Sequence, residues 1–160
     1  MNIMRNVDRM TDYKVSHLAS SESVSRGFWE LIQFESKGDH RGNLIAIEGL
    51  NDIPFDIKRV YYLIKTKENV RRGYHAHLNL DQVLLVVSGS CKVMVDDGNR
   101  KEEFKLDNVQ KGLRIKNLVW REMFEFSSDC VLLVLASDHY NEEDYIRDYS
   151  EFTAAVRIQK

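Results

Sequence analysis

The chain has 160 residues, of which 43% are apolar and 30% charged, and its formal net charge is −2. This size and composition predict one globular domain with its own core. The small negative charge argues against non-specific binding to nucleic acid or anionic membranes, and no apolar run approaches the roughly 18 residues of a membrane span. Residues 1–25 lack the apolar centre of a signal peptide, so a cytoplasmic protein is expected.

The order of elements along the chain is typical of an all-β protein. Residues 1–28 show no clear periodicity and are predicted to be an N-terminal extension, which leaves 29–160 as the folded domain. From there, short strand-like runs alternate with turns every 8–12 residues, as in a sandwich or barrel. Residues 37–42 form a polar turn, and Asp97-Gly98 is a strong hairpin signal because both central residues need positive φ. The expected strands are 29–34, 43–48, 57–64, 71–77, 82–87, 91–95, 101–106, 112–115, 120–126 and 131–135.

A helix is predicted only near the C-terminus. Asn141 suits an N-cap, and the three acidic residues that follow it suit the positive end of the helix dipole. Tyr145, Tyr149, Phe152 and Val156 then follow at roughly helical spacing. We therefore expect one short helix beginning after Asn141.

Each of the two cysteines, Cys91 and Cys130, lies inside an apolar strand-like run. There is no Cys-x-x-Cys spacing and no secretory signal, so buried free thiols are predicted. A disulfide is the less favoured alternative, because cytoplasmic thiols are kept reduced.

The most informative motif is the pair His75 and His77, one residue apart in a predicted strand. Residues i and i+2 of a strand point to the same face, so the two imidazoles are expected side by side. Such a pair suits metal ligation or proton transfer near neutral pH. A purely structural role is disfavoured, because each buried imidazole needs hydrogen-bond partners.

The residues around this pair decide between metal and proton chemistry. Small barrels of the cupin (jelly-roll) type follow a His-x-His pair with a carboxylate ligand and a later histidine. Here Gln82 stands at the carboxylate position and Arg121 at the later histidine position, and a guanidinium cannot coordinate a metal. Glu122 would contribute a ligand only in another register. Proton transfer without metal or other cofactor is therefore favoured.

Several segments together resemble the nucleotide-sugar 3,4-ketoisomerases of the cupin superfamily, over about residues 29–150. The resemblance implies an all-β cupin/jelly-roll β-barrel with a short C-terminal helix. It also implies an isomerase that moves the carbonyl of dTDP-4-keto-6-deoxy-D-glucose from C4 to C3, which leads to 3-amino-3,6-dideoxy sugars of O-antigen or S-layer glycans. The segments are 57–62, 72–77, 81–84, 88–91, 126–131 and 135–140.

This activity agrees with the residues. A proton beside a ketone is acidic, so a base can remove it from C3 to give an enediolate, and protonation at C4 leaves the carbonyl at C3. His75 and His77 are predicted to share the proton transfers, in an order that the sequence leaves open, as it does the configuration at C4. Tyr62 is a candidate donor to the enediolate oxygen, although a core aromatic would look the same.

The diphosphate of a dTDP-sugar calls for arginines. The candidates are Arg41, Arg59, Arg72 and Arg121, with Gln82 as a further substrate-binding residue. Arg59 has the stronger case because it lies in an apolar strand, whereas Arg41 lies in a turn and fits a solvated loop charge equally well. Related cupins pair through their sheets, so a homodimer is expected.

Other functions remain open at this point. A 3,5-epimerase acting on the same substrate class would use the same enolate chemistry but return the proton to the same carbon. A non-catalytic cupin that binds a nucleotide sugar is a second alternative, and a metal-dependent dioxygenase is the least favoured.

Overall fold

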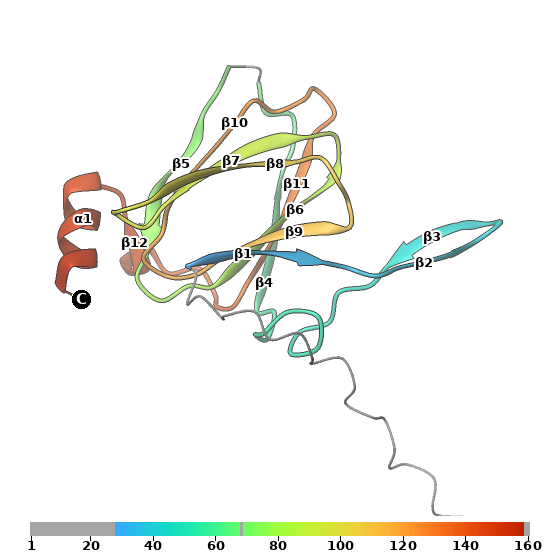
Figure 1. Cartoon of the computed structure of the whole chain (residues 1–160), viewed down its shortest axis with the longest axis horizontal. Helices are drawn as coiled ribbons and strands as arrows, with labels where there is room; N and C mark the ends of the chain where they lie inside the picture. The colour runs from blue at the N-terminus through green and yellow to red at the C-terminus, as the bar shows by residue number, and fades with distance from the viewer. Residues whose placement is uncertain (1–27, 68, 159–160) are drawn as a thin grey trace, which may run out of the picture.

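The computed structural model describes residues 28–158 except Glu68, so nearly all of the predicted extension, 1–28, lies outside the described residues. Two five-stranded antiparallel sheets face each other as a jelly-roll sandwich (Figure 1). The predicted all-β cupin/jelly-roll class is confirmed. The first sheet has β1 (Trp29–Gln33), β9 (Lys111–Ile115), β6 (Gln82–Ser88), β11 (Val131–Ala136) and β4 (Arg59–Leu63), in that order. The second has β12 (Tyr145–Ile146), β5 (Arg72–His77), β10 (Trp120–Phe124), β7 (Cys91–Asp96) and β8 (Lys101–Leu106).

The main core fills the space between the sheets. The alternation of strand side chains sends Leu84 and Val86 of β6 into this space, where they join Leu132 and Val134 of β11. A second apolar cluster, containing Val83 and Leu85 as well as Leu135, covers the outer face of the same two strands. Strand β6 is therefore buried on both faces, as its unbroken apolar sequence predicts.

The predicted free thiols are present, and so is the predicted hairpin at Asp97-Gly98, although only Gly98 of these two residues has a positive φ. Cys91 and Cys130 are buried and not paired in a disulfide. The chain reverses between β7 and β8 where the Asp97 N–H donates to the Arg100 carbonyl, and Gly98 has a φ of 86°. That left-handed conformation is one that glycine adopts without steric cost.

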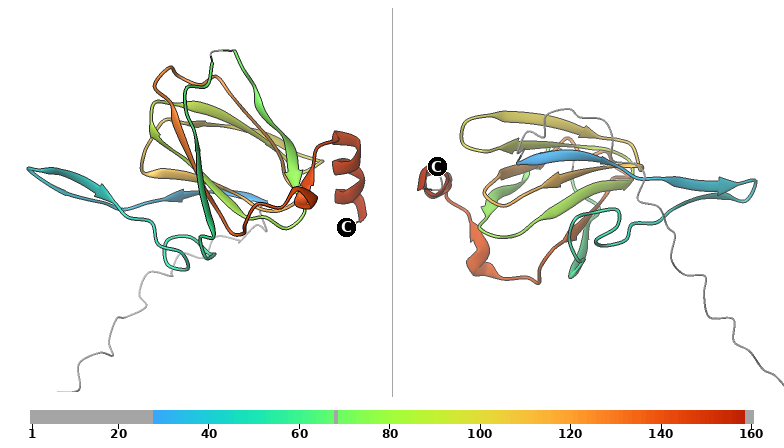
Figure 2. Two further views of the ribbon diagram at one scale, coloured as in Figure 1. Left: turned by 180° about the vertical axis from the view of Figure 1, so that it is seen from behind. Right: turned by 60° about the horizontal axis from the view of Figure 1, so that its bottom comes forward.

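The predicted polar turn at 37–42 is shorter than expected. Residues on either side of His40 and Arg41 pair as strands β2 (Ser36–Asp39) and β3 (Gly42–Ile45), which form a separate two-stranded sheet. This hairpin projects away from the sandwich, on the side opposite the C-terminal helix, in every view (Figures 1 and 2).

The predicted start of the helix is wrong. Asn141 caps only the 3-10 helix η1 (Glu142–Asp144), and the chain then extends as β12. The helix α1 (Tyr149–Ile158) begins later, with Asp148 accepting the N–H groups of Ser150 and Glu151. Pairing of β12 with the edge of β5 overrides the local helical signal, because tertiary contacts outweigh intrinsic propensity.

Helix α1 covers the outer face of the second sheet. Phe152 and Val156 are buried against Trp120, and burial of each such side chain stabilises the fold by about 1.5–3 kcal/mol. The Tyr149 hydroxyl donates to the buried Asp96 carboxylate at 2.6 Å. Within residues 28–158, no helix is long and apolar enough to span a membrane.

Candidate active site

A cavity of about 540 Å³ opens between the two sheets. Its wall comes from β4, β6 and β11 of the first sheet, from β5, β10 and β12 of the second, and from residues just beyond β11. Four arginines and several aromatic rings face it, which is a wall suited to an anionic ligand with a polar ring. Its polar lining residues are Arg59, Tyr61, Tyr62, Arg72, His75, Gln82, Arg121, Tyr140, Tyr145 and Arg147.

The structure brings the two predicted histidines together on one face of β5. Their ring centroids are 4.9 Å apart, with the rings nearly perpendicular. His75 lines the cavity, whereas His77 lies behind it and is completely buried. The ring of Tyr145, which pairs with His77 across β12 and β5, contacts both imidazoles.

Each imidazole has its Nδ1 atom held. Nδ1 of His75 lies 3.0 Å from the Gly73 carbonyl oxygen, and Nδ1 of His77 lies 2.9 Å from Oδ2 of Asp144. Both partners are acceptors, so both Nδ1 atoms carry the hydrogen in the neutral rings. The Nε2 atom of each ring is left with a lone pair, and Nε2 of His77 is buried with no hydrogen-bond partner in the described part of the chain.

Both histidines are held in the neutral form. Burial first, and then the nearby Arg121 charge, lower the pKa of His75 to about 4. The same two causes, burial first, hold the pKa of His77 well below its usual range. Two neutral imidazoles with free Nε2 lone pairs are proton acceptors.

The direction of the His75 side chain depends on an irregularity in β5. Its pairing with β10 shifts register at Arg121, beside Gly73 and Tyr74, which have φ values of 96° and 53°. A Cβ on Gly73 would lie 2.6 Å from the Arg121 carbonyl oxygen. Only glycine fits this position.

We expect Gly73→Ala to lower the free energy of unfolding by about 1–3 kcal/mol, because it adds both backbone strain and a clash. Chemical denaturation measures the loss. Gly42→Ala is the matched control, since Gly42 also has positive φ but has no atom within 4 Å of the added Cβ. Equal losses in the two variants would contradict the close approach.

Strand β4 places Tyr61, not the predicted Tyr62, inside the cavity. Arg59 and Tyr61 point inward, whereas Tyr62 borders the cavity from the opposite face of the strand and is 62% exposed. The buried Gln82 donates its side-chain N–H to the Tyr61 hydroxyl at 2.9 Å. The Tyr61 proton is therefore free to donate toward the cavity, and burial raises the pKa of Tyr61.

Arg121 is buried in the cavity wall with its charge largely unpartnered. It is 1% exposed, and its Nε and Nη1 atoms have no hydrogen-bond partner among residues 28–158. Its Nη2 makes only a long contact of 3.5 Å to the Lys116 carbonyl oxygen. Burial lowers the pKa of Arg121 to about 10, which still leaves it protonated at neutral pH. A buried charge without a partner is costly, so this guanidinium is preorganised for a ligand.

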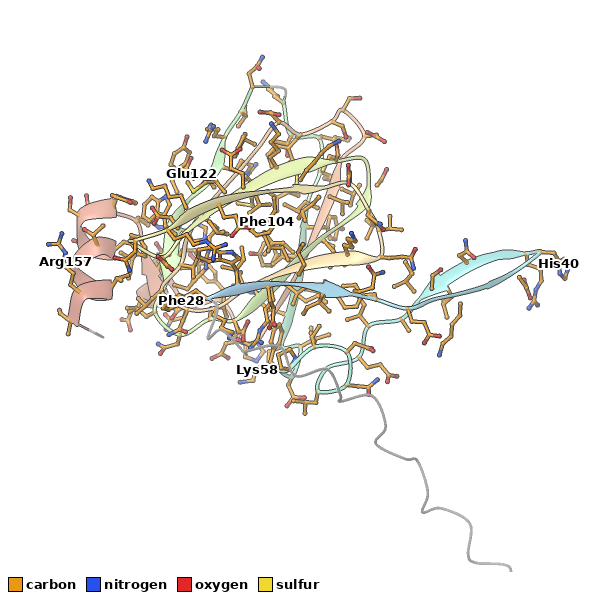
Figure 3. The ribbon with its side chains drawn as sticks, viewed as in Figure 1. Phe28, His40, Lys58, Phe104, Glu122 and Arg157 are labelled. Atoms are coloured by element: carbon orange, nitrogen blue, oxygen red, sulfur yellow. The ribbon has the colours of Figure 1, made fainter. Side chains whose placement is uncertain are left out.

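Of the other predicted arginines, Arg59 and Arg72 line the cavity and Arg41 does not. Arg59 lies 5.3 Å from the Tyr61 ring, and its Nε has no partner in the described residues. Arg41 lies in the turn of the projecting hairpin beside His40, which Figure 3 labels at the tip, and pairs with Asp39. Arg41 therefore lies outside the cavity of its own chain, because the hairpin points away from the sandwich, and its role in substrate binding stays a prediction.

The residues around the histidines do not form a metal donor set. Gln82 and Arg121 face the same cavity as His75, as the sequence comparison with cupin sites implies. Glu122 accepts from Arg71 and from the Trp120 indole instead, so it supplies no ligand. No group of three or more His, Cys, Asp or Glu side chains suited to a metal occurs between residues 28 and 158, Glu68 aside.

The sequence did not predict five residues of the site: Tyr61, Tyr140, Asp144, Tyr145 and Arg147. The last three lie in the segment that the sequence predicts to be helical. Arg147 lies 4.4 Å from the Tyr145 ring, and its guanidinium donates to Glu142. No local pattern in the sequence marks the residues that follow Asn141. For Tyr61 a signal exists, because Arg59 and Tyr62 are three residues apart on one strand and so cannot share a face, whereas Arg59 and Tyr61 can.

The chain is similar to known sugar isomerases over most of its length. A model of the family described as "FdtA: WxcM-like, C-terminal" matches residues 28–157. A TDP-4-oxo-6-deoxy-alpha-D-glucose-3,4-oxoisomerase from Aneurinibacillus thermoaerophilus is 53% identical over 134 residues, which cover 82% of this chain and 96% of the relative.

Two solved structures agree with this sequence similarity. A histidine-to-asparagine variant of the 3,4-ketoisomerase QdtA from Thermoanaerobacterium thermosaccharolyticum, in complex with TDP-4-keto-6-deoxyglucose, has a TM-score of 0.81 and 45% identity, covering 82% of this chain and 96% of that chain. The WlaRB TDP-quinovose 3,4-ketoisomerase from Campylobacter jejuni has a TM-score of 0.76 and 46% identity, covering 79% of this chain and 97% of that chain. The chain belongs to the FdtA family (WxcM-like, C-terminal).

Proposed function

We propose that this protein is the 3,4-ketoisomerase of dTDP-4-keto-6-deoxy-D-glucose. The observation that carries the proposal is the pair of neutral imidazoles, His75 and His77, beside a cavity that also holds an unpartnered buried arginine. The relatives named above are enzymes of this activity, which favours it over 3,5-epimerisation and over a non-catalytic binding role. The product serves the synthesis of 3-amino-3,6-dideoxy sugars.

The reaction needs two kinds of proton transfer. One base removes the proton from C3 and a proton returns to C4, while the proton on the C3 hydroxyl must pass to the oxygen at C4. One proton moves between the carbons C3 and C4, and another moves between their two oxygens. These transfers require two proton acceptors within reach of adjacent atoms of the sugar. We assign these roles to Nε2 of His75, which lines the cavity, and to Nε2 of His77, whose ring lies behind the cavity with its centroid 4.9 Å from that of His75.

The remaining polar groups divide between the sugar and the diphosphate. We assign Arg121 and the Tyr61 hydroxyl to the developing enediolate oxygen, because both line the cavity together with His75. Gln82 positions Tyr61 through its hydrogen bond. Arg59, Arg72 and Arg147 line the same cavity and are proposed to bind the diphosphate.

Incubation with dTDP-4-keto-6-deoxyglucose in D₂O tests the activity. The expected product is the 3-keto sugar with solvent deuterium at C4. Exchange at C3 or C5 with the carbonyl still at C4 would support an epimerase instead. Calorimetric binding of dTDP without either reaction would identify a non-catalytic cupin.

We expect kcat/KM to stay nearly constant from pH 8 down to about 5 and to fall only as the pH approaches 4. The base must be neutral, and the pKa of His75 is lowered to about 4, so protonation abolishes activity only below that range. A pH–rate profile measures the acid limb. A limb near 6.5, the ordinary histidine pKa, would contradict the buried environment.

We also propose a homodimer, in which the β2–β3 hairpin carries Arg41 toward the cavity of the partner subunit. The β2–β3 hairpin forms a sheet of its own away from the sandwich, and an isolated two-stranded hairpin is marginally stable in water. On β4, Val60 and Tyr62 expose apolar side chains that a second copy would cover. Sedimentation of the wild type tests the dimer, and Arg41→Ala should lower kcat/KM only if the hairpin reaches the partner's cavity.

We also propose the bounds of the folded domain and the location of the protein. The folded domain is taken to span residues 29–160, of which 29–158 are described except Glu68. A cytoplasmic location agrees with the two buried cysteines, which are not paired in a disulfide.

A further inference from the structure

Asp144 holds His77 through an asymmetric set of hydrogen bonds. The two residues are 67 positions apart, and Oδ2 of Asp144 meets Nδ1 of His77 at 2.9 Å. The other oxygen, Oδ1, accepts the backbone N–H of Asn79 at 2.8 Å and approaches the Asn79 side-chain nitrogen at 3.4 Å. The backbone is fixed as well, because the Leu78 N–H donates to the Asp144 carbonyl oxygen at 2.9 Å. Each carboxylate oxygen of Asp144 therefore has one partner residue, His77 for Oδ2 and Asn79 for Oδ1.

We propose that Asp144 is a positioning residue that fixes the tautomer of His77, and that the Asn79 backbone amide determines which Asp144 oxygen does so. A carboxylate only accepts hydrogen bonds, so Nδ1 of His77 must carry the hydrogen and Nε2 keeps its lone pair. The ring is completely buried, so water offers no alternative partner. The Asp144 carboxylate also stabilises the imidazolium that forms when Nε2 takes a proton.

The asymmetry makes asparagine a disruptive replacement. An amide has one accepting oxygen and one donating NH₂ group. The Asn79 N–H needs an acceptor, so it fixes the amide oxygen of an Asp144→Asn variant at the former Oδ1 position. The NH₂ group then faces Nδ1 of His77, which must accept. The hydrogen moves to Nε2, and the lone pair that takes the substrate proton is lost.

We therefore expect the isosteric change to harm catalysis more than removal of the side chain. Asp144→Asn should lower kcat by about 10²–10⁴-fold, because it imposes the wrong tautomer. Asp144→Ala leaves Nδ1 without a partner, so both tautomers are populated, and kcat should fall by about 10–100-fold. Glu143→Gln is the matched control, since Glu143 is an exposed carboxylate of the same 3-10 helix and should retain wild-type activity.

Nitrogen-15 NMR of histidine-labelled full-length protein at pH 8 reads the tautomer directly. The wild type should show hydrogen on Nδ1 of His77, and Asp144→Asn should show it on Nε2. His75 should keep hydrogen on Nδ1 in both proteins, because its partner is the Gly73 carbonyl. Hydrogen on Nε2 in the wild type would overturn the proposal, even if the variant failed to fold. Hydrogen on Nδ1 in a folded Asp144→Asn variant would overturn it as well.

The kinetic part rests on the proposed function, whereas the spectroscopic part does not. If wild-type protein fails to convert dTDP-4-keto-6-deoxyglucose, the proposed function fails and the tautomer result still decides the role of Asp144. If the wild type is active and Asp144→Asn retains its kcat, the positioning role fails and the function stands.

Discussion

His75→Asn and His77→Asn should each reduce kcat by about 10²–10⁴-fold, because each removes one of the two Nε2 acceptors. Asparagine is close to histidine in polarity and smaller in volume, so the cavity should remain open. The substrate should still bind, since the arginines are unchanged. Steady-state kinetics with dTDP-4-keto-6-deoxyglucose measures the loss as a fall in kcat with little change in KM.

Deuterium exchange then separates the roles of the two histidines. The variant that lacks the carbon base should lose both the conversion and the exchange at C3. The variant that lacks the oxygen shuttle should still exchange at C3 in D₂O while producing little 3-keto sugar. His139→Asn is the control, because His139 is exposed beyond β11 and should be silent. Wild-type activity in both site variants would instead mean that the histidines are structural.

Arg121→Met should make the protein more stable and much less active. Methionine fills much of the same volume without a charge, and replacing buried ionic groups with apolar side chains of similar volume is often neutral or stabilising, by about 1–4 kcal/mol. Loss of the donor to the enediolate should lower kcat by about 10²–10³-fold. The acid limb of the pH–rate profile should also move to higher pH, because Arg121 is one cause of the lowered pKa of His75.

Urea denaturation and residual activity together test this pair of opposite effects. Arg157→Met, an exposed substitution on α1, should change neither quantity. An Arg121→Met protein that is less stable than the wild type would show that the guanidinium has structural partners. One with full activity would remove Arg121 from the proposed chemistry.

The sequence predicted the sandwich well because its strands alternate and its turns are marked. The prediction was wrong where the sequence did not show which face of a strand points into the cavity. Tyr61 and Tyr62 are adjacent aromatics on β4, and a shift of one residue reverses which of them enters the cavity. Only the inward direction of Arg59 settles the choice, since Tyr61 lies two residues from it.

Long-range partners were the other source of error. Asp144 follows a good N-cap and reads as an acidic first-turn residue, so its sequence context favours a helix. The contact with His77 joins two segments 67 residues apart and has no local signal. The position of Arg41 also has no local signal, because it depends on the projection of the β2–β3 hairpin away from the sandwich.

The wall that completes the site also includes the shortest strand of its sheet, which lies at the sheet edge. Strand β12 has only two residues. It lies at the edge of its sheet, so it pairs with β5 on one side and has no strand on the other side among the described residues. Edge segments with few hydrogen bonds open locally at a lower free energy than the whole domain. Asp144 and Tyr145 would leave with this segment, and the barrel would remain folded. The enzyme should therefore lose activity at a lower urea concentration than the one that unfolds its core, with early hydrogen exchange at Ile146.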